Sequence, residues 1–365
     1  AIRALCYLNL ATWFSRAPYN SLTGASRWNE PCVPVYTTGT SIDTGGQPRE
    51  SLRTVYGRID QDIDRAIELL EKARETTLAE NNKSHINLYV ALGIKSRACL
   101  AEGDWDGAFK AAKRVIDEGG YAVGTKSDLT SGMNSLDKQN VMWGAGIQVA
   151  DQAGGYAGFF THMDNKEGAY AKSAPKLISK QLYNRISATD IRRDWWDPSD
   201  KESPYVSKKF SFANVASFLG DYIYMRVEEM YFTAAEAALR LDDLKSAREL
   251  MNTVMAERDP GYSANNRSGT LLGATTTTWT GSFLENILTH RRIELWGEYG
   301  RLFDVRRLGQ GIDRRTDDGF SEECISMMNR RNVNITKADT YDWVLTIPKA
   351  ELDANPNINE EDQNP

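Results

Sequence analysis

Two similar pairs of short helices, far apart in the chain, constrain its fold more than any other feature of the sequence. Apolar residues at spacings of three and four predict these helix pairs over about 86–121 and 226–262. At one constant offset along the chain, Ala98 lines up with Ala237, and other small residues recur in the same way. Small residues let paired helices approach closely, as in tetratricopeptide-like repeats. Because a long segment separates the two copies, we expect them to be inserted into a larger fold.

The segment before the first copy predicts a further pair of helices. One helix is expected over 1–14, with Ala4, Leu5, Leu8 and Trp13 on or near one face, and the other over 51–76. Residues 15–50 are rich in Pro, Gly, Ser and Thr, which predicts a long loop between them. Residues 1–76 therefore count as the third helix pair.

The other segments predict loops and a few short strands. Residues 122–225 and 263–281 are expected to form a loop-rich lobe, with a strand at 141–143. The C-terminal segment 282–365 opens with Ser282 and Glu285, a capping-box pattern, and ends in a tail from Asp353 that we expect to be extended. The fold class predicted is mainly α, as one domain over 1–365.

Charge and composition exclude several classes of function. The chain carries a net charge of -6, which argues against nucleic acid because a phosphate backbone needs a basic face. The three His are scattered, the four Cys are isolated, and Cys6 and Cys99 are expected to be buried. No metal site or cofactor is predicted, and no apolar run approaches the length of a membrane span.

Several strings, in order along the chain, carry a family resemblance. They are Gly103-Asp104-Trp105, Val115-Ile116-Asp117 through Tyr121, Arg226 through Tyr231 with Ala235-Glu236-Ala237, Arg291-Arg292-Ile293-Glu294-Leu295, Arg301 through Arg307, Ile347-Pro348, Asn355-Pro356 and Gln363-Asn364-Pro365. The chain resembles the SusD/RagB family of nutrient-binding lipoproteins. It departs from the family pattern at Glu298-Tyr299-Gly300, where the Gly is shifted by one position.

The resemblance implies a function and a location. A SusD-like protein captures oligosaccharide or polysaccharide at the cell surface without cleaving it, needs no cofactor, and delivers it to a TonB-dependent SusC-like transporter. The resemblance implies a surface-exposed lipoprotein of the outer membrane. Because the chain begins with Ala1 inside a predicted helix, we expect an N-terminal portion with the lipidated Cys to precede it.

Aromatic residues in loops are the candidates for ligand contact, because flat rings can cover the apolar face of a sugar. The candidates are Trp28, Tyr36, Tyr156, Phe159, Phe160, Trp196 and Trp279. The nearest polar partners in the sequence are Asp164, Asn165 and Arg49. By contrast, Trp105, Trp143, Trp296 and Trp343 lie in predicted regular elements, and we expect them to pack.

Charged residues over 291–306 suggest either catalysis or a structural network. We expect a network, in which Arg291 with Glu294, or Glu298 with Arg301, pair at helical spacing. Two alternatives to glycan capture stay open. A glycoside hydrolase would need two facing carboxylates, which a sequence cannot pair. A tetratricopeptide-type scaffold would bind a protein or peptide, and the cargo of a SusD-like protein need not be a sugar.

Overall fold

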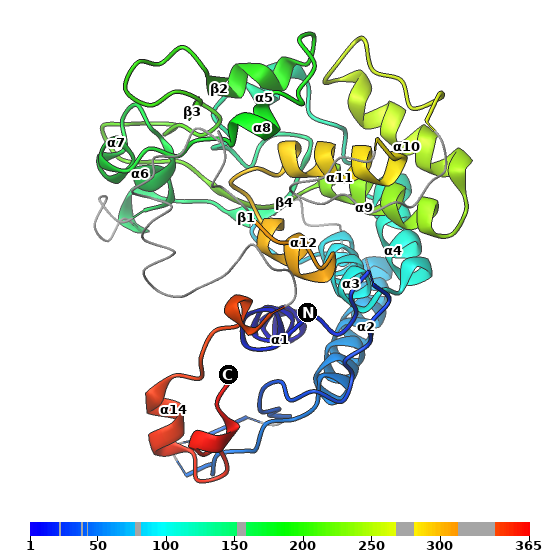
Figure 1. The fold of residues 1–365 in the computed structure, drawn as a ribbon, viewed down its shortest axis with the longest axis vertical. Helices are drawn as coiled ribbons and strands as arrows, with labels where there is room; N and C mark the ends of the chain where they lie inside the picture. Colours follow the sequence, from blue (N-terminus) through cyan, green and yellow to red (C-terminus); the bar gives the residue numbers. More distant parts are fainter. Residues whose placement is uncertain are drawn as a thin grey trace.

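Helix pairs stacked side by side form one flank of the molecule in the computed structural model (Figure 1). The structure describes residues 1–21, 23–37, 39–41, 43–76, 82–151, 158–267, 281–312 and 340–365. Within them the pairs are α1 (Ile2–Phe14) with α2 (Leu52–Thr76), α3 (Leu88–Glu102) with α4 (Trp105–Glu118), and α9 (Val227–Arg240) with α10 (Leu244–Ala256). Helix α2 packs on α3 and α4 packs on α9, so the two similar pairs are neighbours in space despite their separation in sequence.

The turns inside the two similar pairs use the same chemistry. At the end of α3, Gly103 adopts a left-handed conformation with φ of 78°, and the equivalent Asp242 after α9 has φ of 63°. A side chain at Gly103 would also collide with the ring of Tyr19. The next residues, Asp104 and Asp243, cap α4 and α10 by accepting from backbone amides three residues on, each at 3.0 Å.

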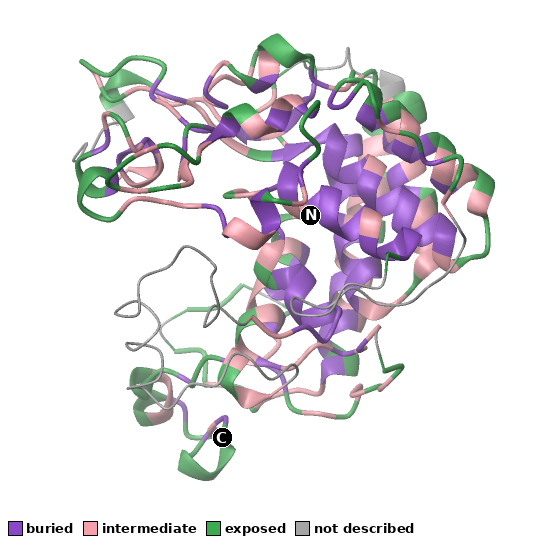
Figure 2. Ribbon diagram, turned by 45° about the horizontal axis from the view of Figure 1, so that its top comes forward, coloured by how far each residue is buried: buried purple, intermediate pink, exposed green. Residues whose placement is uncertain are grey.

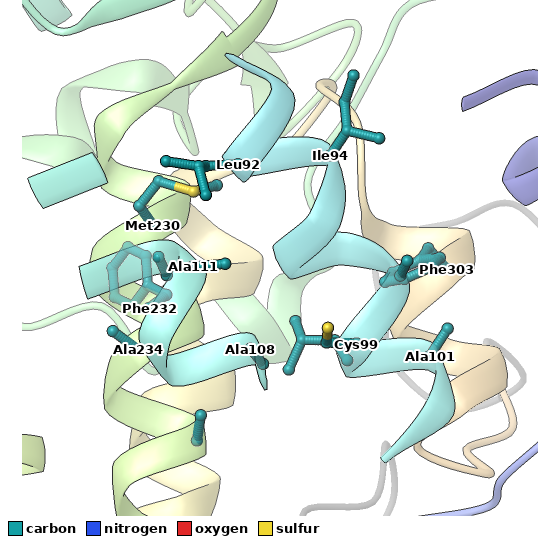
Figure 3. Close-up of a cluster of buried hydrophobic side chains, with 14 of the residues drawn as sticks. Leu92, Ile94, Cys99, Ala101, Ala108, Ala111, Met230, Phe232, Ala234 and Phe303 are labelled. Atoms are coloured by element: carbon teal, nitrogen blue, oxygen red, sulfur yellow. The ribbon is translucent and has the colours of Figure 1, made fainter. Parts of the chain in front are cut away.

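The equivalent small residues lie fully buried where the helices meet. Ala98 and Ala237 have no exposed surface, and neither do Ala108 and Ala247. Figure 3 shows part of this core, with side chains of α3 lying between those of α4 and α9 on one side and Phe303 of α12 (Arg301–Arg307) on the other. Interiors are packed to crystal density, so a larger side chain at these positions would force the helices apart. Buried residues gather in these helices, as Figure 2 shows.

The loop-rich lobe lies beside the helix pairs (Figure 1). Its short helices are α5 (Lys126–Leu129), α6 (Phe159–Met163), α7 (Ala169–Ser173) and α8 (Lys180–Tyr183), with short 3-10 turns at Val149–Asp151 and Ile191–Trp195. Strand β1 (Val141–Ala145) pairs antiparallel with β4 (Tyr222–Arg226), and β2 (Trp196–Asp197) pairs with β3 (Val206–Ser207). The segment expected to be rich in loops thus also contains short helices such as α6.

The C-terminal segment is folded back onto the long loop that follows α1. It contains α14 (Lys349–Ala354) and 3-10 turns at Tyr341–Trp343 and Glu360–Asp362, so the expectation of an extended tail is wrong. The amide of Asn355 donates to the carbonyl of Gln47 at 2.9 Å, and Arg49 donates to the carbonyl of Asp362 at 2.6 Å. These polar contacts explain why a polar tail is ordered against the loop.

A buried ionic network joins α11 (Phe283–Glu294) to the repeats and the lobe. Glu294, which is fully buried, accepts from Arg192, Arg226 and Arg258, each at 3.0 to 3.1 Å. Arg291 instead donates to Asp304 at 2.8 Å. As expected, these charged groups form a structural network. The predicted pairing of neighbours at helical spacing is wrong, because Arg291 and Glu294 each pair with residues of other elements.

Two further observations concern the exposure of apolar groups. Among the residues that the structure describes, no helix is both long and apolar enough to cross a membrane. Cys99 and Cys32 are buried, but Cys6 is exposed, so the expectation for that thiol is wrong. Cys6 lies on the face of α1 opposite Ala4, Leu8 and Ala11, the residues that this helix buries.

Glu102, at the end of α3, makes stability depend on pH. Burial first, and then the carboxylates of Asp60 and Asp104, raise the pKa of Glu102 to about 8, and its Oε1 has no hydrogen bond. A carboxyl whose pKa rises on folding stabilises the fold fully below its unfolded pKa, and this contribution is lost as the pH rises towards 8. We expect Glu102→Gln to be more stable than the parent chain at pH 8.5, by roughly 1–4 kcal/mol, and equally stable at pH 4.5.

Urea denaturation at the two pH values measures this difference. The control is Glu249→Gln, which changes an exposed carboxyl on α10. A Glu102→Gln chain that is as pH-dependent as the parent would show that Glu102 does not cause the effect.

Candidate functional site: an aromatic cavity between the helix pairs and the lobe

A cavity of about 450 Å³ lies where α1, α3, the two-stranded β1–β4 sheet and the lobe meet. Seven of its lining residues are aromatic, and the rest are mostly apolar. The lining consists of Leu5, Asn9, Trp13, Arg97, Met133, Trp143, Phe159, Phe210, Tyr222, Ile223, Tyr224, Gly297, Glu298 and Tyr299. A concave, mainly apolar site with a few polar groups has the form of a small-molecule binding site.

An irregularity in the β1–β4 sheet brings two large rings to the cavity. Trp143 is opposite Met225 and Gly144 is opposite Ile223, so Tyr224 has no partner across the ladder. A bulge of this kind redirects a side chain. The ring of Tyr224 meets that of Trp143 edge-on, with 5.0 Å between centroids, and is 41% exposed. A side chain at Gly144 would collide with the backbone of Tyr222, so the close approach of the strands requires glycine there.

Helix α1 supplies a second wall of the cavity. Leu5, Asn9 and Trp13 are four residues apart and form one stripe along the helix, on a different face from the buried Ala4 and Leu8. Trp13 is 45% exposed. Asn9 donates its amide to the carbonyl of Leu5 at 3.0 Å, which leaves its side-chain oxygen available as an acceptor.

The lobe closes the cavity with packed aromatic rings. Phe159 of α6 meets Phe210 edge-on at 5.3 Å between centroids, and both line the cavity. Phe160 lies behind them, buried against Phe212 at 5.7 Å. These rings fix one another, so the lobe side of the cavity is formed before any ligand arrives.

The charged groups at the cavity are already paired. Glu298 accepts from Lys209 at 2.5 Å and from Arg226 at 2.8 and 2.9 Å. Burial acts to raise the pKa of Glu298, but the charges of Arg226 and Lys209 outweigh it and hold the pKa below its usual range. Arg97 makes a two-bond ion pair with Glu229 at 2.8 and 2.6 Å.

Tyr299 lies beneath Arg97 at the same end of the cavity. The guanidinium carbon of Arg97 lies 3.9 Å from the centre of the Tyr299 ring. Burial raises the pKa of Tyr299 to about 12, so its hydroxyl stays protonated at neutral pH. A cation over a ring face is an attractive arrangement that also orients the guanidinium.

The candidates from the sequence are scattered rather than gathered. Phe159 lines the cavity, and Phe160 is buried just behind it. Trp196 is 2% exposed and packs edge-on between Trp195 and Trp296, so the prediction that it faces a ligand is wrong. Tyr156 and Trp279 lie outside the described residues.

The two candidates in the long loop after α1 lie away from this cavity. Trp28 packs against the main core, with its ring edge-on to Tyr56 at 5.7 Å. Tyr36 lines a separate, more open and polar pocket of about 520 Å³ with Arg3, Tyr7 and loop hydroxyl groups. The backbone of Tyr36 donates to the hydroxyl of Tyr7 at 2.7 Å, which anchors the loop on α1.

The polar partners suggested by the sequence serve the fold. Asp164 is buried and accepts from the backbone of Lys166, Glu167 and Phe212. Asn165 bonds the backbone of neighbouring segments, and Arg49 holds the C-terminal segment. Since their hydrogen bonds are used within the chain, we no longer regard these three as ligand contacts.

Sequence reasoning missed Trp13, Trp143, Tyr224 and Tyr299, because residues in regular elements were expected to pack. Trp143 does pack on the main core, but it also lines the cavity. One signal was present: α1 is apolar on two faces, and a single helix pair can bury only one of them. Among the described residues, no group of His, Cys, Asp and Glu is arranged to hold a metal ion.

Stacked helix pairs joined to a loop-rich lobe, with an aromatic cavity between them, place this chain in the class of helical-repeat proteins that carry a binding lobe. Within that class the chain belongs to the SusD family, whose sequence profile matches residues 162–365. No curated protein matches the sequence.

Solved structures agree with this assignment. A SusD-like carbohydrate binding protein from Bacteroides vulgatus is 27% identical, with a TM-score of 0.77, and the match covers 99% of this chain and 75% of that one. A SusD superfamily protein from Bacteroides thetaiotaomicron is 22% identical, with a TM-score of 0.77 and coverage of 100% and 76%. Surface glycan-binding protein A from Bacteroides uniformis is 16% identical, with a TM-score of 0.65 and coverage of 100% and 76%. The last two show the shared fold alone.

Proposed function

We propose that this chain binds oligosaccharide in the aromatic cavity, without cleaving it, and hands it to a TonB-dependent SusC-like transporter in the outer membrane. The observation that carries the proposal is the group of rings around one cavity, among which Trp13 and Tyr224 are exposed. Exposed rings beside a polar acceptor suit a sugar, which has an apolar face and hydroxyl groups at its edge. The name of the 27% identical relative, a carbohydrate binding protein, supports the same ligand class.

The acids at the cavity support binding rather than hydrolysis. Glu298 is the one carboxylate among the described lining residues. Its bonds to Lys209 and Arg226 and its lowered pKa make it a poor proton donor and occupy the oxygens that a nucleophile would use. A glycosidase of the usual kind needs a second carboxylate across the sugar, with one of the two protonated.

Membership of the SusD family supports the proposed transporter and the proposed place at the cell surface. A lipid anchor ahead of Ala1 would hold the protein at the outer membrane, with the cavity presented to the transporter as under a lid. The packed flank of helix pairs offers a rigid surface for that partner. Co-purification of the full-length protein with a SusC-like protein from outer membranes tests this part. Absence of the full-length protein from the membrane fraction would contradict the proposed location and partner.

Binding itself is tested by a glycan screen on the folded chain. We expect at least one oligosaccharide to change the tryptophan fluorescence in a saturable way, because Trp13 and Trp143 line the cavity. Chromatography of each bound ligand should show no shortened product. Cleavage of a bound glycan would favour the hydrolase. Failure of every glycan, in a chain shown to be folded, would favour the peptide-binding scaffold, whose helix pairs do form a continuous stack here.

A further inference from the structure

Arg97 has hydrogen-bond donors that the protein does not use. Its Nε and Nη2 both donate to Glu229, and Nη2 also donates to the carbonyl of Tyr224 at 3.0 Å. No described residue accepts from Nη1, although the side chain is 2% exposed and lines the cavity. Nη1 is not among the fully buried polar atoms that lack a partner, so it keeps accessible surface and can donate to a ligand in the cavity.

The position of this donor is held rigidly. Glu229 fixes the guanidinium in its plane by two bonds, and the ring of Tyr299 supports its face at 3.9 Å. An arginine held in this way can donate only to an oxygen at a defined position, because its planar guanidinium holds the donors in a fixed geometry. The side-chain oxygen of Asn9 supplies an acceptor at the same cavity.

The charges at the cavity are balanced without a ligand. Glu229 neutralises Arg97, while Arg226 and Lys209 neutralise Glu298. A sugar carboxylate or sulfate would lose its hydration on entering, and Arg97, the cation among the described lining residues, is already paired with Glu229. Burying an anion without a free cation is expensive.

We propose that the cavity selects uncharged sugar residues, and that Nη1 of Arg97 donates a hydrogen bond to an oxygen of the bound sugar. This rests on the proposed function, because it names the class of glycan for the same cavity. It also gives the cavity a polar point of recognition beside its apolar rings.

The class of ligand is tested on the unaltered chain by calorimetry. The neutral probes are gluco-, manno-, galacto- and xylo-oligosaccharides, and the acidic probes are oligogalacturonate, oligomannuronate and chondroitin sulfate fragments. We expect a neutral probe to bind with an affinity that changes less than about twofold between low and high salt. An acidic probe that binds most tightly, and weakens with salt, would overturn the selectivity but leave glycan capture standing. No binding by either class would overturn both.

The role of Arg97 is tested by Arg97→Lys, which keeps the charge beside Glu229 but removes the fork. We expect the parent chain to bind the best neutral ligand about tenfold more tightly than one of its monodeoxy forms. Arg97→Lys should bind both forms about equally. If Arg97 had only a structural role, Arg97→Lys would lower the affinity for the ligand and for its monodeoxy form by the same factor. That result would overturn the assignment.

The matched control is Arg193→Lys. Arg193 also lies over a tyrosine ring, that of Tyr183 at 4.3 Å, but outside the cavity. It should keep the parent affinity and the parent discrimination. Circular dichroism establishes that both variants are folded, and an Arg97→Lys chain that fails to fold is replaced by Arg97→Gln paired with Glu229→Gln, for which the same loss of discrimination is expected.

Discussion

Replacing Glu294 with glutamine is expected to destabilise the folded chain by about 3–5 kcal/mol. Glu294 is fully buried and accepts hydrogen bonds from Arg192, Arg226 and Arg258. The three cations pull the pKa of Glu294 well below its ordinary value, against the effect of burial. Glutamine has almost the same shape but no charge, so it would leave an uncompensated positive charge in the interior.

Urea denaturation monitored by circular dichroism measures this loss. The control is Glu68→Gln on α2, whose carboxylate makes ion pairs with Arg65 and Lys72 at 2.6 Å on the exposed surface. We expect no measurable change there, because water replaces surface ion pairs. A Glu294→Gln chain that unfolds at the same urea concentration as the parent would mean that the network does not hold α11 in place.

Replacing Tyr224 with alanine is expected to weaken glycan binding at least about tenfold, with little loss of stability. The ring is 41% exposed and lies at the cavity beside Trp143, so its removal takes away contact area for the ligand rather than core packing. Titration of the best glycan from the screen, followed by tryptophan fluorescence or calorimetry, gives the ratio of affinities.

Tyr170→Ala is the matched control for this change. Tyr170 is 45% exposed and also stacks on one ring, that of His162 at 4.5 Å, but it does not line the cavity. We expect its affinity to equal that of the parent. If both variants bind equally well, the ligand lies elsewhere, and the open pocket beside Tyr36 becomes the next site to test.

The helix pairs could be predicted because their signals are local. The spacing of apolar residues, Gly103 at a left-handed turn, and Asp104 and Asp243 as caps all act within a few residues of the chain. The equivalence of Ala98 and Ala237 follows from the same local pattern, and both are fully buried. Fold class and family follow from such features, since they repeat in order along the sequence.

The candidate site could not be predicted in the same way. Its walls come from α1, α3, the β1–β4 sheet and the lobe, which lie far apart in the sequence. Tyr224 reaches the cavity because of a bulge, and the sequence of an isolated strand does not reveal one. Trp196 shows the reverse error: it lies in a loop-rich segment, yet two other Trp rings bury it.

The helices, their caps and the small residues at their contacts could be read from the chain, because these features depend on neighbours within one or two turns. Which charges pair and which rings meet depends instead on how distant segments pack in the folded molecule. Glu294 lies three residues after Arg291 on the same helix, yet it binds Arg192, Arg226 and Arg258 from other elements. The physical reason is that burial makes an unpaired charge costly, so each group takes the partner that packing brings nearest, wherever it lies in the chain.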